Sequence, residues 1–130
     1  MQDFFSTTHD LAVIFQMLLD RGICGDRRYL SRATCDLFMG MKAKNSRRGL
    51  GFDKPDVESD DNSPCAPEAP ASVFGHTGFT GTCVWVDPDN ELVFVFLSNR
   101  TYPVAFGHDN LMKLDIRSRI QQAMYQSIMY

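Results

Sequence analysis

Apolar residues at the start of the chain recur every three to four positions and predict an amphipathic helix. The stripe consists of Leu11, Ile14, Phe15, Leu18 and Leu19. Thr7 and Asp10 precede it with the spacing of a capping box, with Asp in place of the usual Glu. Gly22 follows at a position where a C′ glycine would end the helix.

A second helix is predicted from Ser31, as its N-cap, to Met39, with Gly40 as its stop. Leu30 and Cys35 flank this cap with the spacing of a hydrophobic staple. Ser31 is interpreted as a cap rather than a nucleophile, because serine is a preferred N-cap residue.

Two strand-like runs predict a β-hairpin in the second half of the chain. Residues 82–86 are rich in β-branched and aromatic side chains, and Pro88 occupies the second position of a predicted type I turn. Residues 92–97 are all apolar, whereas a strand with one solvated face would alternate. We therefore expect helices on both faces of the sheet. Shorter strands are predicted at 49–52 and 72–74.

The last predicted element is one helix capped by Asp109 or Asn110. Its apolar residues repeat every four positions and are expected to pack in the core: Met112, Ile116, Ile120, Met124 and Ile128, supported by Ala123. The order helix, helix, strand, loop, strand, hairpin, helix predicts an α+β fold with an antiparallel sheet.

Composition fits a single globular domain, or part of one, over residues 1–130. Apolar residues make up 44% of the chain, which is sufficient for a core, and the net charge is −3. No basic excess suggests nucleic acid, and Arg47 and Arg48 are interpreted as a solvated pair. No apolar run reaches the length of a membrane span, and no signal peptide is recognisable. Residues 53–71 hold four of the six prolines and six acidic residues, which predicts an acidic surface loop.

The cysteines and histidines give no metal or redox motif. Cys24, Cys35, Cys65 and Cys83 form no C-x-x-C pair. They are interpreted as free, mostly buried thiols, with one disulfide involving an exposed Cys65 as the alternative. The three histidines, His9, His76 and His108, are scattered, so no metal and no cofactor is expected.

The segment from Phe74 to Thr82 carries the candidate chemistry, because three glycines punctuate it. His76 can shuttle a proton or bind a substrate carboxylate, and the Thr77 hydroxyl can donate to the same group. Gly78 lets a ligand approach the main chain, and the N–H of Phe79 is then placed to stabilise an oxyanion. Taken alone, the His-Thr-Gly triplet is more simply a glycine-rich turn.

In its ordered motifs the chain resembles the C-terminal part of the serine β-lactamase and penicillin-binding-protein superfamily, in particular its class C-like hydrolases. The segments that carry the resemblance follow the family order: residues 5–19, 29–34, 48–52, 75–82 and 97–100. The box at 75–82 is similar to the His-Thr-Gly variant of the Lys-Thr-Gly box. The resemblance implies an antiparallel sheet with helices on both faces and acyl transfer to serine followed by hydrolysis.

Two other boxes that the resemblance requires are absent from the sequence. No serine is followed by lysine three residues later, and no tyrosine by asparagine two residues later. We therefore expect a C-terminal fragment that is inactive alone, with Met1 as an internal residue or a mispredicted start. It is expected to lack the N-terminal part of the same domain and to expose a sheet edge and apolar surface. The resemblance implies a small-molecule or peptidoglycan-derived substrate and a periplasmic or extracellular location.

Two other interpretations stay open. The chain could be a non-catalytic accessory module, such as the second module of a family 3 glycoside hydrolase that acts on cell wall. The Asn99-Arg100-Thr101 sequon would also suit a eukaryotic secreted protein, although such triplets often arise by chance.

Overall fold

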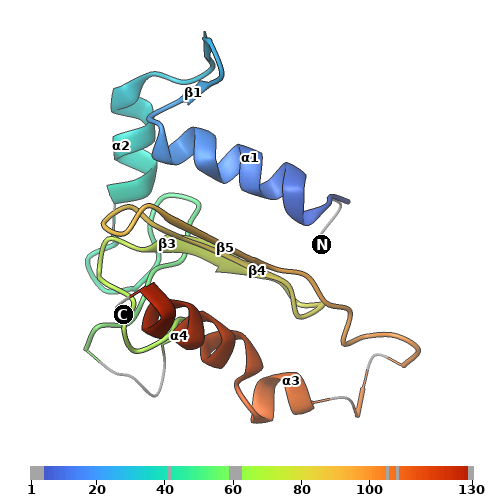
Figure 1. Ribbon diagram of the computed structural model, residues 1–130. Coiled ribbons are helices and arrows are strands. Elements are labelled where there is room, and N and C mark those ends of the chain that lie inside the picture. The colour runs from blue at the N-terminus through green and yellow to red at the C-terminus, as the bar shows by residue number, and fades with distance from the viewer. Residues whose placement is uncertain (1–4, 41, 59–62, 105, 108, 129–130) are drawn as a thin grey trace.

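An antiparallel sheet between two layers of helices forms the centre of the molecule (Figure 1). The computed structural model describes residues 5–40, 42–58, 63–104, 106–107 and 109–128. Within them the sheet has the strand order β3-β4-β5. Its strands are β3 (Phe74–Thr77), β4 (Cys83–Asp87) and β5 (Leu92–Phe96). The expected α+β architecture with an antiparallel sheet is confirmed.

The first helix, α1 (Thr8–Leu19), begins as the sequence predicts, but its C′ residue lies one position before the predicted Gly22. The Thr7 hydroxyl oxygen accepts the N–H of Asp10 at 3.2 Å. At the other end Arg21 is the C′ residue with φ 54°, and Gly22 lies one position later. The N–H groups of Arg21 and Gly22 bond the carbonyls of Leu18 and Met17, which is a Schellman motif. Gly22 is needed there because a Cβ would overlap the Leu30 carbonyl.

The second helix, α2 (Arg32–Gly40), confirms the predicted cap, because the Ser31 hydroxyl accepts the N–H of Thr34 at 3.0 Å. Leu30 and Cys35 pack in the same apolar cluster, as their spacing suggests. Between the two helices, β1 (Ile23–Cys24) and β2 (Arg27–Arg28) form a small hairpin that the sequence pattern did not predict.

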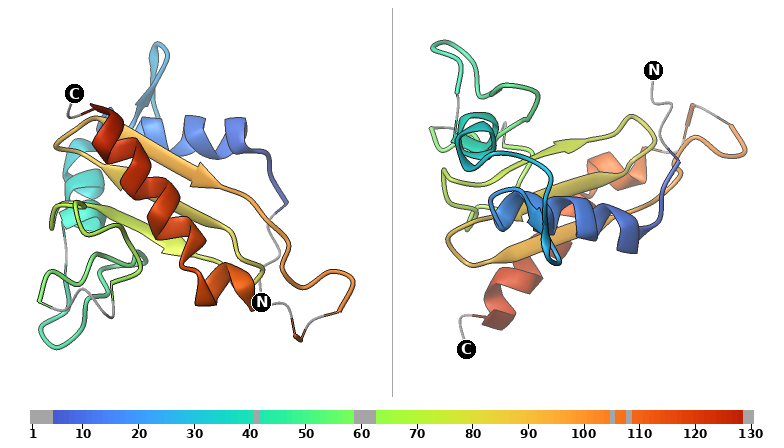
Figure 2. Two further views of the ribbon diagram at one scale, coloured as in Figure 1. Left: turned by 60° about the horizontal axis from the view of Figure 1, so that its bottom comes forward. Right: turned by 90° about the horizontal axis from the view of Figure 1, so that it is seen from above.

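The two faces of the sheet serve two separate cores. Along β5, Leu92, Phe94 and Phe96 belong to a cluster with Tyr125, whereas Val93 and Val95 belong to a cluster with Leu18. Figure 2 shows α4 (Ile116–Ile128) across one face and α1 across the other. The prediction that β5 is covered on both faces is therefore confirmed. It is also an outer strand, because β4 is its one paired neighbour among the described residues.

The predicted final helix is divided, and its buried face differs from the prediction. Asp115, with φ 46°, separates α3 (Asn110–Lys113) from α4. Ser118, Gln121 and Tyr125 are the buried residues of α4. Their polar atoms are satisfied by Asp115, the Ala66 N–H and Asp87, which is how a helix can bury polar groups. The predicted apolar stripe is instead largely exposed at Met112 (52%), Ile120 (39%) and Ile128 (52%).

The predicted strand at 49–52 is wrong, because these residues form a turn. The N–H of Gly49 donates to the Phe52 carbonyl at 2.8 Å. The Phe52 ring packs against Phe74, with ring centroids 5.0 Å apart. The extended pairing begins one residue later, where Asp53 and Gly75 exchange two main-chain hydrogen bonds of 2.7 and 3.1 Å.

Residues 53–71 are irregular as predicted where they are described, but several of them enter the core. Asp53, Lys54 and Cys65 are buried, and Ala66 and Ala69 join the cluster around Tyr125. All four cysteines are free and three are buried, which confirms the thiol interpretation. Cys65 is 3% exposed, so the expectation of an exposed Cys65 in a disulfide is wrong. Among the described residues no helix is long and apolar enough to cross a membrane.

Candidate active site

The His-Thr-Gly triplet lies at the end of β3 and in the turn that follows. His76 pairs with Val84 and Thr77 with Cys83 across the β3–β4 ladder. The N–H of Gly78 then donates to the Thr82 carbonyl at 2.7 Å, and the N–H of Gly81 donates to Gly78 at 3.0 Å. The triplet is therefore anchored in the sheet on its first two residues and in a hydrogen-bonded turn on its third.

On the outer edge of β3, Gly75 is paired with Asp53, whereas no bridge partner is found for the residues of β3 that follow it in the described structure. Gly75 bonds outward to Asp53 through both main-chain groups. Main-chain groups alternate between the two sides of a strand, so the N–H and carbonyl groups of Thr77, the last residue of β3, also point outward. Phe79 lies beyond β3, in the turn. A side chain at Gly75 is excluded, because a Cβ would overlap the Val84 carbonyl and the Trp85 ring. This edge is therefore a short row of main-chain donors and acceptors beside the triplet.

Arg100 fixes the turn that carries Phe79. Its Nε donates to the Phe79 carbonyl at 2.7 Å, and its main-chain N–H donates to Thr80 at 2.9 Å. The guanidinium also stacks over the Phe79 ring at 4.6 Å from the centroid. The Phe79 N–H forms no hydrogen bond within the described part of the chain. The arrangement holds this donor in a fixed place.

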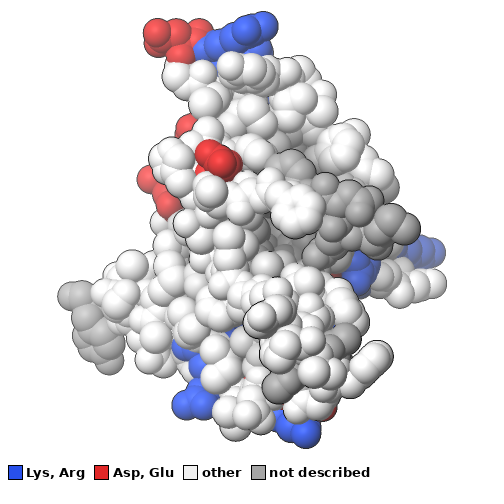
Figure 3. Space-filling view, turned by 90° about the vertical axis from the view of Figure 1, so that its right-hand side faces the viewer, with Lys and Arg blue, Asp and Glu red and all other residues white. Residues whose placement is uncertain are grey.

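A cleft of about 650 Å³ adjoins the triplet. None of the described residues that line it is Asp, Glu, Lys or Arg, and most atoms on the face in Figure 3 belong to uncharged residues. Ser98 lines this cleft, but its hydroxyl oxygen is buried and finds no hydrogen-bond partner among the described residues. The lining comes from the start of α1 and the ends of the strands: Phe5, Ser6, Leu11, Phe15, His76, Thr77, Gly78, Thr80, Thr82, Cys83, Val84, Leu97, Ser98 and Asn99.

Cys83 pairs with Thr77 across the β3–β4 ladder and carries a thiol, but this thiol is unsuited to nucleophilic attack at neutral pH. The thiol is buried, and burial raises its pKa from 9.0 to about 11, while Arg117 lowers it by a smaller amount. The thiolate is the reactive form of cysteine. At neutral pH Cys83 is therefore an apolar wall residue of the cleft.

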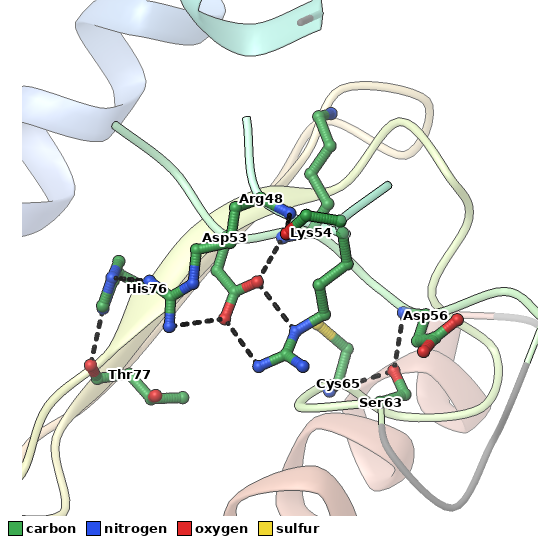
Figure 4. Close-up of polar contacts among 10 residues, drawn as sticks. Arg48, Asp53, Lys54, Asp56, Ser63, Cys65, His76 and Thr77 are labelled. Carbon is green, nitrogen blue, oxygen red and sulfur yellow. Dashed lines mark hydrogen bonds and ion pairs between the residues drawn. The ribbon is translucent and has the colours of Figure 1, made fainter. Parts of the chain in front are cut away.

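A charged network contacts His76 from the side of β3. Figure 4 shows the Arg48 guanidinium between the Asp53 carboxylate and the His76 ring. Arg48 Nη1 lies 2.8 Å from His76 Nε2, and Arg48 Nη2 lies 3.8 Å from Asp53 Oδ2. The other ring nitrogen, His76 Nδ1, lies 2.6 Å from the Thr77 carbonyl oxygen. Both ring nitrogens are therefore engaged by groups of the protein itself.

Asp53 is the anchor of this network. Its carboxylate is 1% exposed and accepts two hydrogen bonds from Arg47, at 2.8 and 3.1 Å. This bidentate geometry is the strongest form of an arginine–carboxylate pair. The Lys54 N–H adds a third hydrogen bond at 3.0 Å. A buried carboxylate with this many donors keeps its position, and it holds both arginines beside β3.

The sequence analysis missed these three residues. Arg47 and Arg48 were interpreted as a solvated pair and Asp53 as part of a surface loop, yet Arg47 contacts the buried Asp53 and Arg48 contacts His76. The one available signal was the opposite charge of Asp53 shortly after the two arginines. Nothing in the local pattern indicates that the intervening turn brings all three to β3.

The described residues contain no group of three or more histidine, cysteine or acidic side chains able to hold a metal ion. His76 and His9 belong to different elements, β3 and α1, and His108 lies outside the described residues.

Comparison with known proteins identifies what this arrangement is similar to. The model of the Beta-lactamase family matches residues 1–116. A protein of Escherichia coli O157:H7 named as a D-alanyl-D-alanine carboxypeptidase is 35% identical over 111 residues, which cover 82% of this chain and 24% of that protein. A protein of the same name from Salmonella typhi is 34% identical over 106 residues, covering 78% and 23%. The chain thus spans about a quarter of the length of these curated relatives.

The fold has a solved counterpart. The crystal structure of a β-lactamase from Mycobacterium bovis superimposes with a TM-score of 0.70. The match covers 94% of this chain and 44% of that structure, at 24% sequence identity. At this identity the likeness concerns the fold, and it agrees with the sheet and helix layers described above.

Proposed function

Because this chain belongs to the β-lactamase family, we propose that it forms the His-Thr-Gly wall of a serine hydrolase active site. The reaction is acyl transfer: a serine oxygen attacks the carbonyl carbon of an ester, amide or β-lactam and expels the leaving group. Water then attacks the acyl-serine, releases the acid and returns the proton to the serine oxygen. The serine and its lysine, and the tyrosine relay, would come from an N-terminal part of the same domain, since their motifs do not occur in these 130 residues.

The observation that carries this proposal is the outer edge of β3 beside an uncharged cleft. The N–H of Phe79, in the turn after β3, has no acceptor in the described structure, and Arg100 holds that turn between the cleft residues Gly78 and Thr80. Such a preorganised donor is what stabilises the negative oxygen of a tetrahedral intermediate. Thr77 lines the same cleft, and its hydroxyl would bind a polar group of the substrate. His76 and Gly78 complete the wall.

The substrate class follows from the relatives. Their name refers to D-alanyl-D-alanine, the dipeptide at the end of peptidoglycan stem peptides. We propose a peptidoglycan-derived or similar small acyl substrate with a carboxylate near the scissile bond. This substrate implies that the complete protein acts in the periplasm or outside the cell.

Labelling tests the reaction class. The full-length protein that contains these residues should form a stable adduct with a fluorescent penicillin or a fluorophosphonate, on a serine outside residues 1–130. Mass spectrometry of the labelled peptide locates that serine. Absence of labelling by both reagents in folded protein would contradict the proposal and favour the accessory-module interpretation.

A matched pair of histidine variants tests the role of the wall. His76→Ala should slow acylation by about a hundredfold, the size of effect typical for a group that assists proton transfer or substrate orientation. His9→Ala is the control, because His9 lies on α1 and not on this cleft, and it should leave acylation unchanged. An unaltered kcat/KM in His76→Ala would remove His76 from the site.

A further inference from the structure

We propose that Arg48 is a positioning residue that fixes the orientation of the His76 ring and, in the neutral form of the ring, the tautomer with its proton on Nδ1. This inference rests on the proposed function for its catalytic meaning, but its geometry is independent of any reaction.

The partners of the two ring nitrogens determine where the proton lies. The Thr77 carbonyl oxygen, 2.6 Å from Nδ1, can only accept a hydrogen bond, so Nδ1 must carry a proton. The Arg48 guanidinium, 2.8 Å from Nε2, can only donate, so Nε2 must offer its lone pair. The Nδ1–H tautomer is the one form of the ring that satisfies both contacts. A second proton on Nε2 would set two donors against each other and displace Arg48.

The Arg48 guanidinium is held in this position by the buried Asp53 carboxylate. Arg48 Nη2 faces Asp53 Oδ2 at 3.8 Å, and Asp53 is 1% exposed and bonded to the main chain of Gly75. Gly75 immediately precedes His76 in β3. The carboxylate that orients Arg48 is therefore tied to the same strand as the imidazole that Arg48 contacts, and the three groups move as one unit.

The charged and titratable groups near His76 are few. Arg48 touches the ring, Arg47 and Asp53 lie behind Arg48, and Cys83 lies across the ladder beside Thr77. Burial keeps the Cys83 thiol protonated, since its pKa is raised to about 11. Arginine does not lose its proton in proteins, so the group that contacts Nε2 stays a donor at every pH.

Nuclear magnetic resonance can read the tautomer directly. The full-length protein is prepared with isotope-labelled histidine, and the His76 signals are assigned by their loss in His76→Gln. Long-range nitrogen–proton correlations at a pH where the ring is neutral distinguish a protonated Nδ1 from a protonated Nε2. We expect the Nδ1–H pattern in the unaltered protein, whereas neutral histidine in water favours Nε2–H.

Arg48→Met removes the donor to Nε2 and leaves only the Thr77 contact, so the share of the Nδ1–H form should fall, whereas Arg48→Lys keeps a donor and should preserve Nδ1–H. Arg32→Met, an exposed arginine on α2, is the matched control and should change nothing. The proposal is overturned if the unaltered protein has Nε2–H, or if Arg48→Met leaves the share of the Nδ1–H form unchanged. The spectrum of the unaltered protein decides the matter even if a variant fails to fold. The readout needs no turnover, so absence of an acyl-serine would count against the proposed function alone.

Discussion

Two buried carboxylates in this protein are stabilised in different ways. Asp53, beside the outer edge of β3, is held by the guanidinium groups of Arg47 and Arg48. Asp87, in the hairpin turn between β4 and β5, is held by neutral donors: the Asp89 and Asn90 N–H groups, the Asn90 amide and the Tyr125 hydroxyl. Both carboxylates are at most 2% exposed.

The two clusters differ in what else their donor residues contact. The partners of Asp87 end within the hairpin and α4, so that cluster closes a turn and attaches a helix to it. One partner of Asp53 continues to His76 and so reaches the cleft. We infer that Asp87 serves stability and Asp53 serves the site. Equal burial therefore does not imply an equal role. The two carboxylates differ in whether one of their partners also contacts a residue of the cleft.

The largest loss of stability is expected from Asp87→Ala. This variant removes four hydrogen bonds to a carboxylate and leaves the Tyr125 hydroxyl buried without an acceptor. The free energy of unfolding should fall by about 3 kcal/mol. Denaturant unfolding measures this, with Asp89→Ala, whose carboxylate is exposed, as a control that should change it by less than about 1 kcal/mol. Equal losses in the two variants would contradict a structural role specific to Asp87.

A smaller loss of about 2 kcal/mol is expected from Asp53→Ala. Arg47 is about a third exposed, so its unpaired guanidinium can recover part of its hydration. The distinguishing effect should be functional, because Arg48 loses its anchor and His76 loses a fixed donor. Acylation by the full-length protein should slow about tenfold in this variant and stay near the normal rate in Asp87→Ala at a temperature where both are folded. The opposite order of rates would reverse the two assigned roles.

Tyr125→Phe isolates one bond of the Asp87 cluster. It removes the 2.7 Å hydrogen bond to Asp87 Oδ2 and keeps the three donors from the turn. We expect a loss of about 1.5 kcal/mol in unfolding free energy. Thermal unfolding followed by circular dichroism gives this value, and a loss as large as that of Asp87→Ala would mean that the turn donors contribute nothing.

Alkaline pH should act on the Asp87 cluster through Tyr125. The pKa of Tyr125 is raised above its usual 10, mainly by burial. The hydrogen bond to Asp87 and the negative charge of Asp87 raise it further. The unfolded chain therefore loses this proton at a lower pH than the folded chain, so the stabilisation is complete below pH 10 and declines as pH rises above it. The slope is at most about 1.4 kcal/mol per pH unit. The stability difference between the unaltered protein and Tyr125→Phe should narrow above pH 10, and a constant difference would contradict this.

The sequence predicted those features that depend on near neighbours. Thr7 and Ser31 cap their helices as expected, and the unbroken apolar run of β5 indicated a strand covered on both faces. The failures have a common cause in long-range contacts. The stripe that includes Ile120 suggested the buried face of α4, but Asp115 interrupts the helix and Tyr125 faces the core instead.

In the candidate site, too, features set by near neighbours were predictable and features set by long-range contacts were not. The placement of His76 and Thr77 at the end of a strand was readable from the glycines and the run that follows them. The arginine that contacts His76 lies 28 residues earlier in an irregular segment, and no local spacing relates the two. Burial of Asp53 depends on its bridge to Gly75, which a turn at 49–52 makes possible and a strand there would not.

A double-mutant cycle tests the central claim, that Arg48 acts on the site through His76. The acylation rate constant is measured for the full-length protein, for Arg48→Met, for His76→Gln and for the combination. Arg48→Met alone should slow acylation about tenfold, but it should change the rate of His76→Gln by less than about twofold, because the group it positions is already gone. Fully independent effects, with the combined loss equal to the product of the single losses, would contradict the account.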